Sequence, residues 1–300
     1  MTQETTLRFY TESGTANPLN LFLTFLCTSI LMIPISYFYS LFIAYFPLIY
    51  FNVIMVIIYG YIVALLSFFF SRIFKIRNTK KAIIITLISA LFAFYCQWVS
   101  FLYIISSENV TLFFEPSLYF NLFVIPFSLF EEILYLNTFG TWEIFSTVFK
   151  GNILWLIWIA EMLIIIVASY LGFSKTKKRP FSEVDHKWYQ KEVFNFDFEA
   201  IKLRKNFIKT YQNNPLDAIN SLEPGNGIRY SNIYVYTSES KRKMLLSIEN
   251  IMVTERGKGK KDIEEILAPH YVDNNTILQL KNKFKVKKSS LFDFFTHLYS

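Results

Sequence analysis

The stretch that decides the fold is ILWLIWIAEMLIIIVASYL, residues 153–171, in which a single carboxylate, Glu161, interrupts an otherwise uncharged run. A helix of roughly 20 apolar residues spans the ~30 Å hydrocarbon core of a bilayer, so this stretch predicts a membrane span. A central acidic residue raises the free energy of inserting a helix into the membrane by about 2.5–3.5 kcal/mol on translocon-based scales. The favourable insertion of the remaining apolar residues outweighs this cost. We therefore expect Glu161 to face the interior of a helical bundle and to have a hydrogen-bond partner.

Three further segments have the length and composition of membrane spans. Residues 21–70 contain no Lys, Arg, Asp or Glu. This uncharged run is too long for one membrane span and has a suitable length for two. Proline suits the first turn of a helix and not its interior, so Pro47 marks the expected break. The four expected spans are residues 20–45, 48–71, 82–105 and 153–171.

Charge is distributed unevenly along the chain. Residues 1–174 hold 7 Lys and Arg and 8 Asp and Glu, whereas residues 175–300 hold 23 and 15. Five basic residues lie in 71–81, and four more follow the last span within 175–179. Because Lys and Arg are enriched in cytoplasmic loops, we expect a multi-pass protein of the cytoplasmic (inner) membrane with both termini in the cytoplasm, the N-terminal arm being residues 1–19.

The loop expected on the outer face, residues 106–152, is apolar and aromatic. It contains Pro126 and the adjacent acids Glu131 and Glu132, which argue against a clean span. We expect an interfacial or re-entrant segment packed on the bundle. The alternative is that residues 118–136 cross the membrane as a fifth span, which would place the C-terminal part outside.

The acidic pair Glu131–Glu132 resembles the glutamate pair of CAAX-type intramembrane proteases. Those enzymes need an Arg four residues after the second Glu and His residues in later spans. Here Leu136 occupies that place, and all three histidines follow residue 180. The sequence also lacks the GxSxG, HExxH and Walker motifs, so it predicts no catalytic residue, metal ligand or cofactor.

Residues 180–300 have the patterns of a small, basic α+β domain on the cytoplasmic side. Apolar residues at helical spacing predict a helix at 196–212. Alternation predicts a hairpin of strands at 231–237 and 243–253. The segment NNTILQLKNKFKV, residues 274–286, is expected to be a third strand.

Lysines cluster in KNKFKVKK near the C-terminus. Such residues attract anionic lipid at about 1 kcal/mol each near a membrane surface, so they are candidates for a lipid-binding face. They are Lys281, Lys283, Lys285, Lys287 and Lys288. The alternative, which the pattern favours, is a basic strand followed by an apolar helix over residues 289–300 that closes the domain core. Nucleic acid is not an expected partner. The positive charge alone would support it, and the sequence has no motif that reads a nucleic-acid groove.

Two polar residues of the third expected span lie near the depth of Glu161. Counting a rise of ~1.5 Å per residue along antiparallel spans places Gln97 within a few ångström of that depth, with Tyr95 close by. A hydrogen bond between Glu161 and Gln97 is the expected pair. Glu161 then serves either as neutral glue between helices, which is the favoured interpretation, or as a proton or substrate site in a cavity.

Three pieces of sequence carry a family resemblance: YFPLIYFN, IRNTKK with AFYCQWVSFLY, and GTWEIF with KGNILWLIWIAEMLIII. Over about residues 20–175 they resemble a group of bacterial membrane proteins with four predicted spans and a cytoplasmic C-terminal tail. The resemblance implies that topology and associates the GTW turn with Glu161. It implies no substrate, cofactor or catalytic residue.

The expected fold is a four-helix membrane bundle with an interfacial or re-entrant segment, followed by a small α+β cytoplasmic domain. The leading functional interpretation is a membrane-anchored interaction or scaffold protein that binds a protein partner, lipid or a second copy of itself. One alternative is a small transporter or channel component that uses Glu161 and Gln97. The other is a membrane enzyme acting on lipid with Glu132 or Glu161 as acid or base, which lacks a positioned partner.

Overall fold

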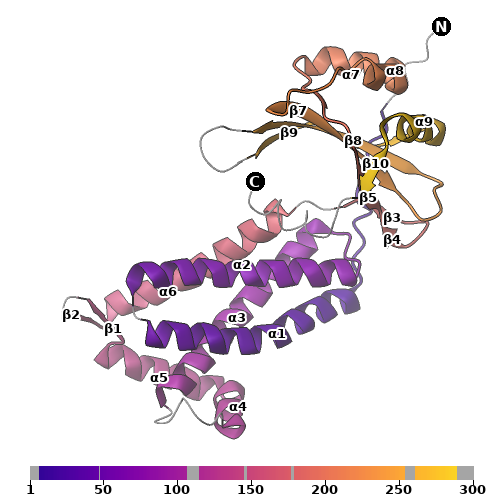
Figure 1. The fold of residues 1–300 in the computed structure, drawn as a ribbon. Helices are drawn as coiled ribbons and strands as arrows, with labels where there is room; N and C mark the ends of the chain where they lie inside the picture. The colour runs from indigo at the N-terminus through magenta and orange to yellow at the C-terminus, as the bar shows by residue number, and fades with distance from the viewer. Residues whose placement is uncertain are drawn as a thin grey trace. The chain divides into compact units, whose positions relative to one another are not determined.

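The structure, a computed structural model, describes residues 7–46, 48–106, 115–144, 147–176, 179–253 and 261–288. The chain divides into two compact units (Figure 1). One is the helical unit Gly14–Thr176, and the other combines Met1–Ser13 with Lys177–Ser300 in a mixed helix and sheet unit. The residues before the first long helix therefore share a unit with the residues after the last one.

Four helices of the first unit are long and apolar enough to cross a membrane. They are α1 (Pro18–Tyr45), α2 (Ile49–Ile73), α3 (Thr79–Ser106) and α6 (Asn152–Lys175). Their bounds lie close to those of the four expected spans. The chain leaves the helical conformation between α1 and α2, but Pro47 itself lies outside the described residues. Among the described residues, four single helices of membrane length are present, as the apolar runs predict, and a bent pair of shorter helices also passes the test of length and composition.

Helices α2 and α6 approach each other through small residues four positions apart. Gly60 and Ala64 of α2 face Ala168 and Gly172 of α6. A Cβ added to Gly60 would lie 2.7 Å from Ala168 Cβ, and one added to Gly172 would lie 2.8 Å from Ala64 Cβ. Ser169 Oγ donates a hydrogen bond to the Gly60 carbonyl oxygen at 2.9 Å. Small residues at this spacing allow helix backbones to come close, which favours packing where water is absent.

Two short helices lie in the described part of the segment between α3 and α6. These are α4 (Pro116–Val124) and α5 (Pro126–Phe139), which meet at 94°. Each begins with proline, a residue that suits the first helical turn and cannot continue a preceding helix. Neither helix has the roughly 20 residues that a straight span needs, so residues 118–136 are not one continuous helix.

The second unit is built on an antiparallel sheet with strand order β10-β5-β7-β8-β9, and β6 pairs with β7. The strands are β5 (Gln190–Phe194), β6 (Phe198–Glu199), β7 (Arg229–Thr237), β8 (Met244–Val253), β9 (Lys261–Val272) and β10 (Val286–Lys288). Strands β3 (Phe181–Ser182) and β4 (Lys187–Trp188) form a separate small hairpin. The predicted hairpin is confirmed as β7 and β8, which pair from Thr237 with Met244 to Arg229 with Met252.

Three helices cover one face of this sheet (Figure 1). They are α7 (Arg204–Asn213), α8 (Pro215–Asn220) and α9 (Asn274–Phe284). Tyr211, Ile219 and Leu280 from the helices meet Ile233 and Leu246 from the strands in a single apolar core. Burying such side chains contributes roughly 1.5–3 kcal/mol each, which holds the two layers together.

Two local predictions for this unit are wrong. Residues 196–212 are not one helix, because β6 pairs with β7 and α7 begins only at Arg204. Residues 274–286 are not a strand, because α9 occupies most of them. In α9 the buried residues are Ile277 and Leu280, three apart, which is the helical period rather than the strand period. The predicted apolar helix over 289–300 lies outside the described residues.

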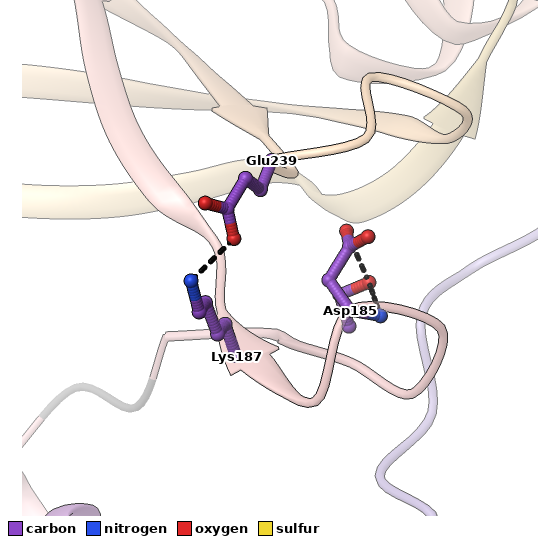
Figure 2. A network of polar contacts seen from close by, with 4 residues as sticks. Asp185, Lys187 and Glu239 are labelled. Carbon is purple, nitrogen blue, oxygen red and sulfur yellow. Dashed lines mark hydrogen bonds and ion pairs between the residues drawn. The ribbon is translucent and has the colours of Figure 1, made fainter.

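The turn between β3 and β4 is tied to the turn between β7 and β8 (Figure 2). Lys187 forms an ion pair with Glu239, and these side chains are 63% and 64% exposed. Because water screens exposed charges, the pair contributes little to the stability of the unit and mainly holds the two turns together. Within the first turn, Ser182 Oγ donates to Asp185 Oδ2 at 3.0 Å. Hydrogen bonding from Ser240, and then from Ser182, holds the pKa of Asp185 below its ordinary value.

His270 is fully buried where β9 passes under α7. Its Nδ1 lies 2.9 Å from the Ala268 carbonyl oxygen, and its Nε2 lies 2.8 Å from Tyr211 Oη. A carbonyl only accepts hydrogen bonds, so Nδ1 carries the proton and Tyr211 donates to Nε2. This arrangement satisfies the neutral imidazole, and burial lowers the pKa of His270.

We expect the mixed helix and sheet unit to lose stability as the pH falls below about 6.5, the ordinary pKa of histidine. The folded-state pKa of His270 is lower, so below pH 6.5 the unfolded chain binds more protons. This contribution is fully present above about pH 6.5 and falls by up to about 1.4 kcal/mol per pH unit as the pH approaches the folded-state pKa. Hydrogen–deuterium exchange of β8 at several pH values measures it. The His270→Gln variant should show a flatter pH dependence than the wild type. An unchanged slope in His270→Gln would contradict the assignment.

Candidate ligand-binding cavity

A cavity of about 240 Å³ lies among the four long helices of the first unit. Its wall is mostly apolar and includes side chains from α1, α2, α3 and α6. The polar groups come from four residues, Asn52, Gln97, Thr141 and Glu161. An apolar hollow with a few convergent polar groups is the form that small-molecule binding sites take.

The Glu161 carboxylate is held by two donors. Tyr39 Oη donates to Oε1 at 2.8 Å, and Gln97 Nε2 donates to the same oxygen at 3.0 Å. The hydrogen bond between Glu161 and Gln97 expected from their depth is therefore present. Both bonds reach one oxygen, so Oε2 has no hydrogen-bond partner among the described residues and remains available to a ligand.

Two amide oxygens in the cavity wall are also unpaired. Gln97 Oε1 and Asn52 Oδ1 are buried and have no hydrogen-bond partner among the described residues. A flip of the Gln97 amide group would exchange the positions of its oxygen and nitrogen. It would also break the hydrogen bond that Nε2 donates to the Glu161 carboxylate. A buried acceptor left unpaired costs about 1–3 kcal/mol, so both oxygens carry an energetic cost in this arrangement.

Aromatic rings form part of the same wall. Trp98 and Trp158 are nearly buried, and their ring centroids lie 4.9 Å apart at an interplanar angle of 87°. Phe101 lines the cavity beside them. The face of an aromatic ring attracts ammonium groups, most strongly when the ring is tryptophan. Together with the carboxylate, these rings favour a positively charged guest.

The GTW turn contributes to the cavity through Thr141. Gly140, just before it, has a φ of +90°, and a Cβ there would lie 2.4 Å from Val148 Cγ1. Only glycine accepts this conformation and this close approach, which fixes the chain between α5 and the hairpin of β1 (Trp142–Ile144) and β2 (Thr147–Phe149). Thr141 and Glu161, which the resemblance associates with each other, line the same cavity.

The other membrane-segment candidates lie elsewhere. The Tyr95 hydroxyl donates to the carbonyl oxygen of Phe123 at the end of α4 and does not contact Glu161. Glu131 and Glu132 are exposed on α5 and do not line the cavity. Of the sequence-predicted polar residues, the structure brings together only Glu161 and Gln97.

Sequence reasoning missed Tyr39 and Asn52. A signal for each was available in the sequence. Asn52 is the one carboxamide side chain in the uncharged run 21–70. Tyr39 lies six residues before the end of α1. At a rise of ~1.5 Å per residue, this position is within a few ångström of the depth of Glu161, as that of Gln97 is.

The five C-terminal lysines do not form one free row. Lys281 forms an ion pair with Glu192 and donates to Thr237 Oγ1 at 3.0 Å, and Lys283 donates to Asn220 Oδ1 at 2.8 Å. Two of the others, Lys285 and Lys287, are exposed, and the side chain of Lys288 lies outside the described part of the chain.

Across the described segments between residues 7 and 288, no group of three or more His, Cys, Asp or Glu could hold a metal ion. No known protein family, curated protein or solved structure matches the chain. The resemblance to four-span bacterial membrane proteins therefore rests on its short motifs alone.

Proposed function

We propose that the chain is an integral membrane protein that binds a small amphiphilic amine between its long helices, as a small transporter or channel component does. The observation that carries this proposal is that Glu161 lies in the wall of one aromatic-lined cavity, beside Gln97 and Asn52, whose amide oxygens are unpaired among the described residues. Acidic residues inside membrane segments face the bundle interior or a cavity and mark substrate or ion pathways.

The chemistry of the wall specifies the guest. The Glu161 carboxylate accepts hydrogen bonds, so the guest supplies a donor, and the rings of Trp98 and Trp158 favour a cationic donor. The cavity of about 240 Å³ is smaller than the roughly 300–1,000 Å³ of sites for drug-sized molecules, so the amine is small. The apolar remainder of the wall suits a short alkyl chain.

The cavity favours the transport interpretation over a purely structural role for Glu161. As glue between helices, Glu161 needs only Tyr39 and Gln97, which already hold it. That role leaves the unpaired Asn52 oxygen and the adjoining hollow without an explanation. A scaffold protein likewise needs no such hollow among its membrane helices.

We also propose an orientation. The basic residues of 71–81 and 175–179 support a cytoplasmic location for the α2–α3 connection and the end of α6, because Lys and Arg are enriched in cytoplasmic loops. The mixed helix and sheet unit is then cytoplasmic, and α4 with α5 lies as an interfacial or re-entrant pair on the opposite side. Glu131 and Glu132 belong to that outer pair.

We expect the purified protein in neutral detergent to bind n-hexylammonium saturably, and the Glu161→Gln variant to bind it about tenfold or more weakly. A hydrogen bond to a charged group contributes about 1.5–3 kcal/mol, and about 1.4 kcal/mol corresponds to a factor of ten. Isothermal titration measures the affinity. Glu131→Gln, which removes an exposed carboxylate from α5, is the matched control and should bind as the wild type does.

Two outcomes would contradict the proposal. One is equal binding of n-hexylammonium by the wild type and Glu161→Gln, which would leave Glu161 as structural glue. The other is binding of n-hexanol as tight as that of n-hexylammonium, which would remove the need for a cation. Uptake of butyltrimethylammonium, a permanent cation, into proteoliposomes then tests transport separately, and Glu161→Gln should abolish it.

A further inference from the structure

A second cavity, of about 230 Å³, lies in the mixed helix and sheet unit. Three cationic side chains line it from two distant parts of the chain. Arg8 comes from the segment before α1, and Arg242 and Lys243 come from the end of the β7–β8 turn. The only carboxylate among the lining residues is that of Asp273.

The N-terminal segment reaches this cavity by pairing with the edge of the sheet. Tyr271 N donates to the Arg8 carbonyl oxygen at 2.9 Å, and Tyr10 N donates to the Pro269 carbonyl oxygen at 2.8 Å. Phe9 thereby forms a β-bridge with His270 on β9. This pairing places the Arg8 guanidinium 5.8 Å from the centre of the Tyr271 ring, and Lys243 Nζ lies 5.8 Å from the same centre.

The β7–β8 turn is held from both sides. Asn274 Nδ2 donates to the carbonyl oxygens of Lys241 at 2.7 Å and Arg242 at 3.3 Å. On the other side, the ion pair of Lys187 with Glu239 ties the start of the turn to β4 (Figure 2). Arg242 and Lys243 therefore project from a turn whose backbone is fixed.

The charges around the cavity are unbalanced. Within the described part of the chain, Arg8, Arg242 and Lys243 form no ion pair with any carboxylate. Asp273 is already engaged, because its Oδ2 accepts from the backbone N–H groups of Asn275 at 3.0 Å and Thr276 at 3.4 Å. Among the described lining residues, three cations therefore face the single carboxylate of Asp273, which leaves the hollow with a net positive charge.

We propose that this cavity binds a phosphate group, carried by a phospholipid or by a soluble phosphate ester. Two guanidinium groups offer planar pairs of donors that match phosphate oxygens, and the lysine adds a compact charge. The site is complete only when the N-terminal segment is paired with β9, because Arg8 belongs to that segment. The proposal is independent of the amine site, which lies in the other unit.

The test uses the full chain in neutral detergent and isothermal titration with three probes: inorganic phosphate, glycerol 3-phosphate and dihexanoyl phosphatidic acid. We expect saturable binding by the wild type and a loss of about tenfold or more in the double variant Arg242→Gln/Lys243→Gln. Arg8→Gln should weaken binding as well. The double variant Lys205→Gln/Lys209→Gln, on exposed positions of α7, makes the same change in net charge and should bind as the wild type does.

The probes also identify the source of the phosphate. Dihexanoyl phosphatidic acid binding about tenfold tighter than glycerol 3-phosphate supports a lipid headgroup, and equal affinities support a soluble ester. Binding that is identical in the wild type and in Arg242→Gln/Lys243→Gln, or no saturable binding of any probe, overturns the proposal. The changed side chains are exposed, so hydrogen–deuterium exchange of β8 and β9 should be unchanged and should confirm that each variant is folded.

Discussion

Replacing Gly60 with Leu is expected to destabilise the helical unit by about 3 kcal/mol, the upper part of the range for overpacking a core. A Cβ at this position would lie 2.7 Å from Ala168 Cβ and 2.8 Å from a backbone carbonyl oxygen of α6. Rotation of a flexible side chain cannot relieve contacts with a methyl group on the backbone and with a carbonyl. Helices α2 and α6 must move apart instead, and the hydrogen bond from Ser169 to Gly60 is lost with them.

Thermal unfolding in detergent, followed by the loss of the monodisperse peak in size-exclusion chromatography, measures this effect. Ser174→Leu adds similar bulk to an exposed position of α6 and should unfold at the wild-type temperature. The same displacement would separate Asn52 on α2 from Glu161 on α6, so Gly60→Leu should also weaken n-hexylammonium binding. Wild-type unfolding of Gly60→Leu would show that the two helices do not need their close contact.

Replacing Phe198 with Ala is expected to destabilise the mixed helix and sheet unit by about 3–5 kcal/mol. The side chain is fully buried, and its ring centroid lies 4.7 Å from that of Phe196 and 4.9 Å from that of Phe284. It joins β6 to the end of α9, so its removal opens a cavity between elements that are distant in sequence. Fixed backbone on both sides limits collapse of the cavity.

Hydrogen–deuterium exchange of β7 in increasing urea measures the local free energy of opening. Leu203→Ala, at a side chain that is 67% exposed, removes a similar chemical group without opening a cavity and should change the value by less than about 0.5 kcal/mol. A loss in Phe198→Ala no larger than in Leu203→Ala would contradict the placement of this ring in the core.

The long helices were predictable because a membrane span is a property of one local segment. An uncharged apolar run of sufficient length predicts a span whatever it packs against. The contact of Glu161 with Gln97 followed from depth alone, since both residues lie nine positions from the ends of antiparallel helices, Asn152 in α6 and Ser106 in α3. Depth does not give the direction of a side chain around the helix axis, however, and the hydroxyl of Tyr95, which lies at a similar depth, donates to the Phe123 carbonyl oxygen instead.

The mixed unit was less predictable because its short elements depend on distant partners. Strand β9 carries Glu264, Glu265 and Pro269, residues that disfavour strands. It forms because β8 supplies a long partner, and proline is tolerated on an edge strand. Helix α9 has lysines interleaved with apolar residues in a way that imitates alternation, and only its packing on the sheet reveals the helical period.

The pairing of the N-terminal segment with β9 has a topological consequence. Residues 8–10 precede the first long helix and residues 269–271 follow the last, yet the two stretches exchange backbone hydrogen bonds. Two segments bonded in this way lie on the same side of any bilayer that the chain crosses, so the number of crossings between them is even. Four long helices satisfy this parity, and a fifth crossing by α4 and α5 would break it. Two hydrogen bonds thus constrain the number of crossings to be even, without reference to hydropathy or charge.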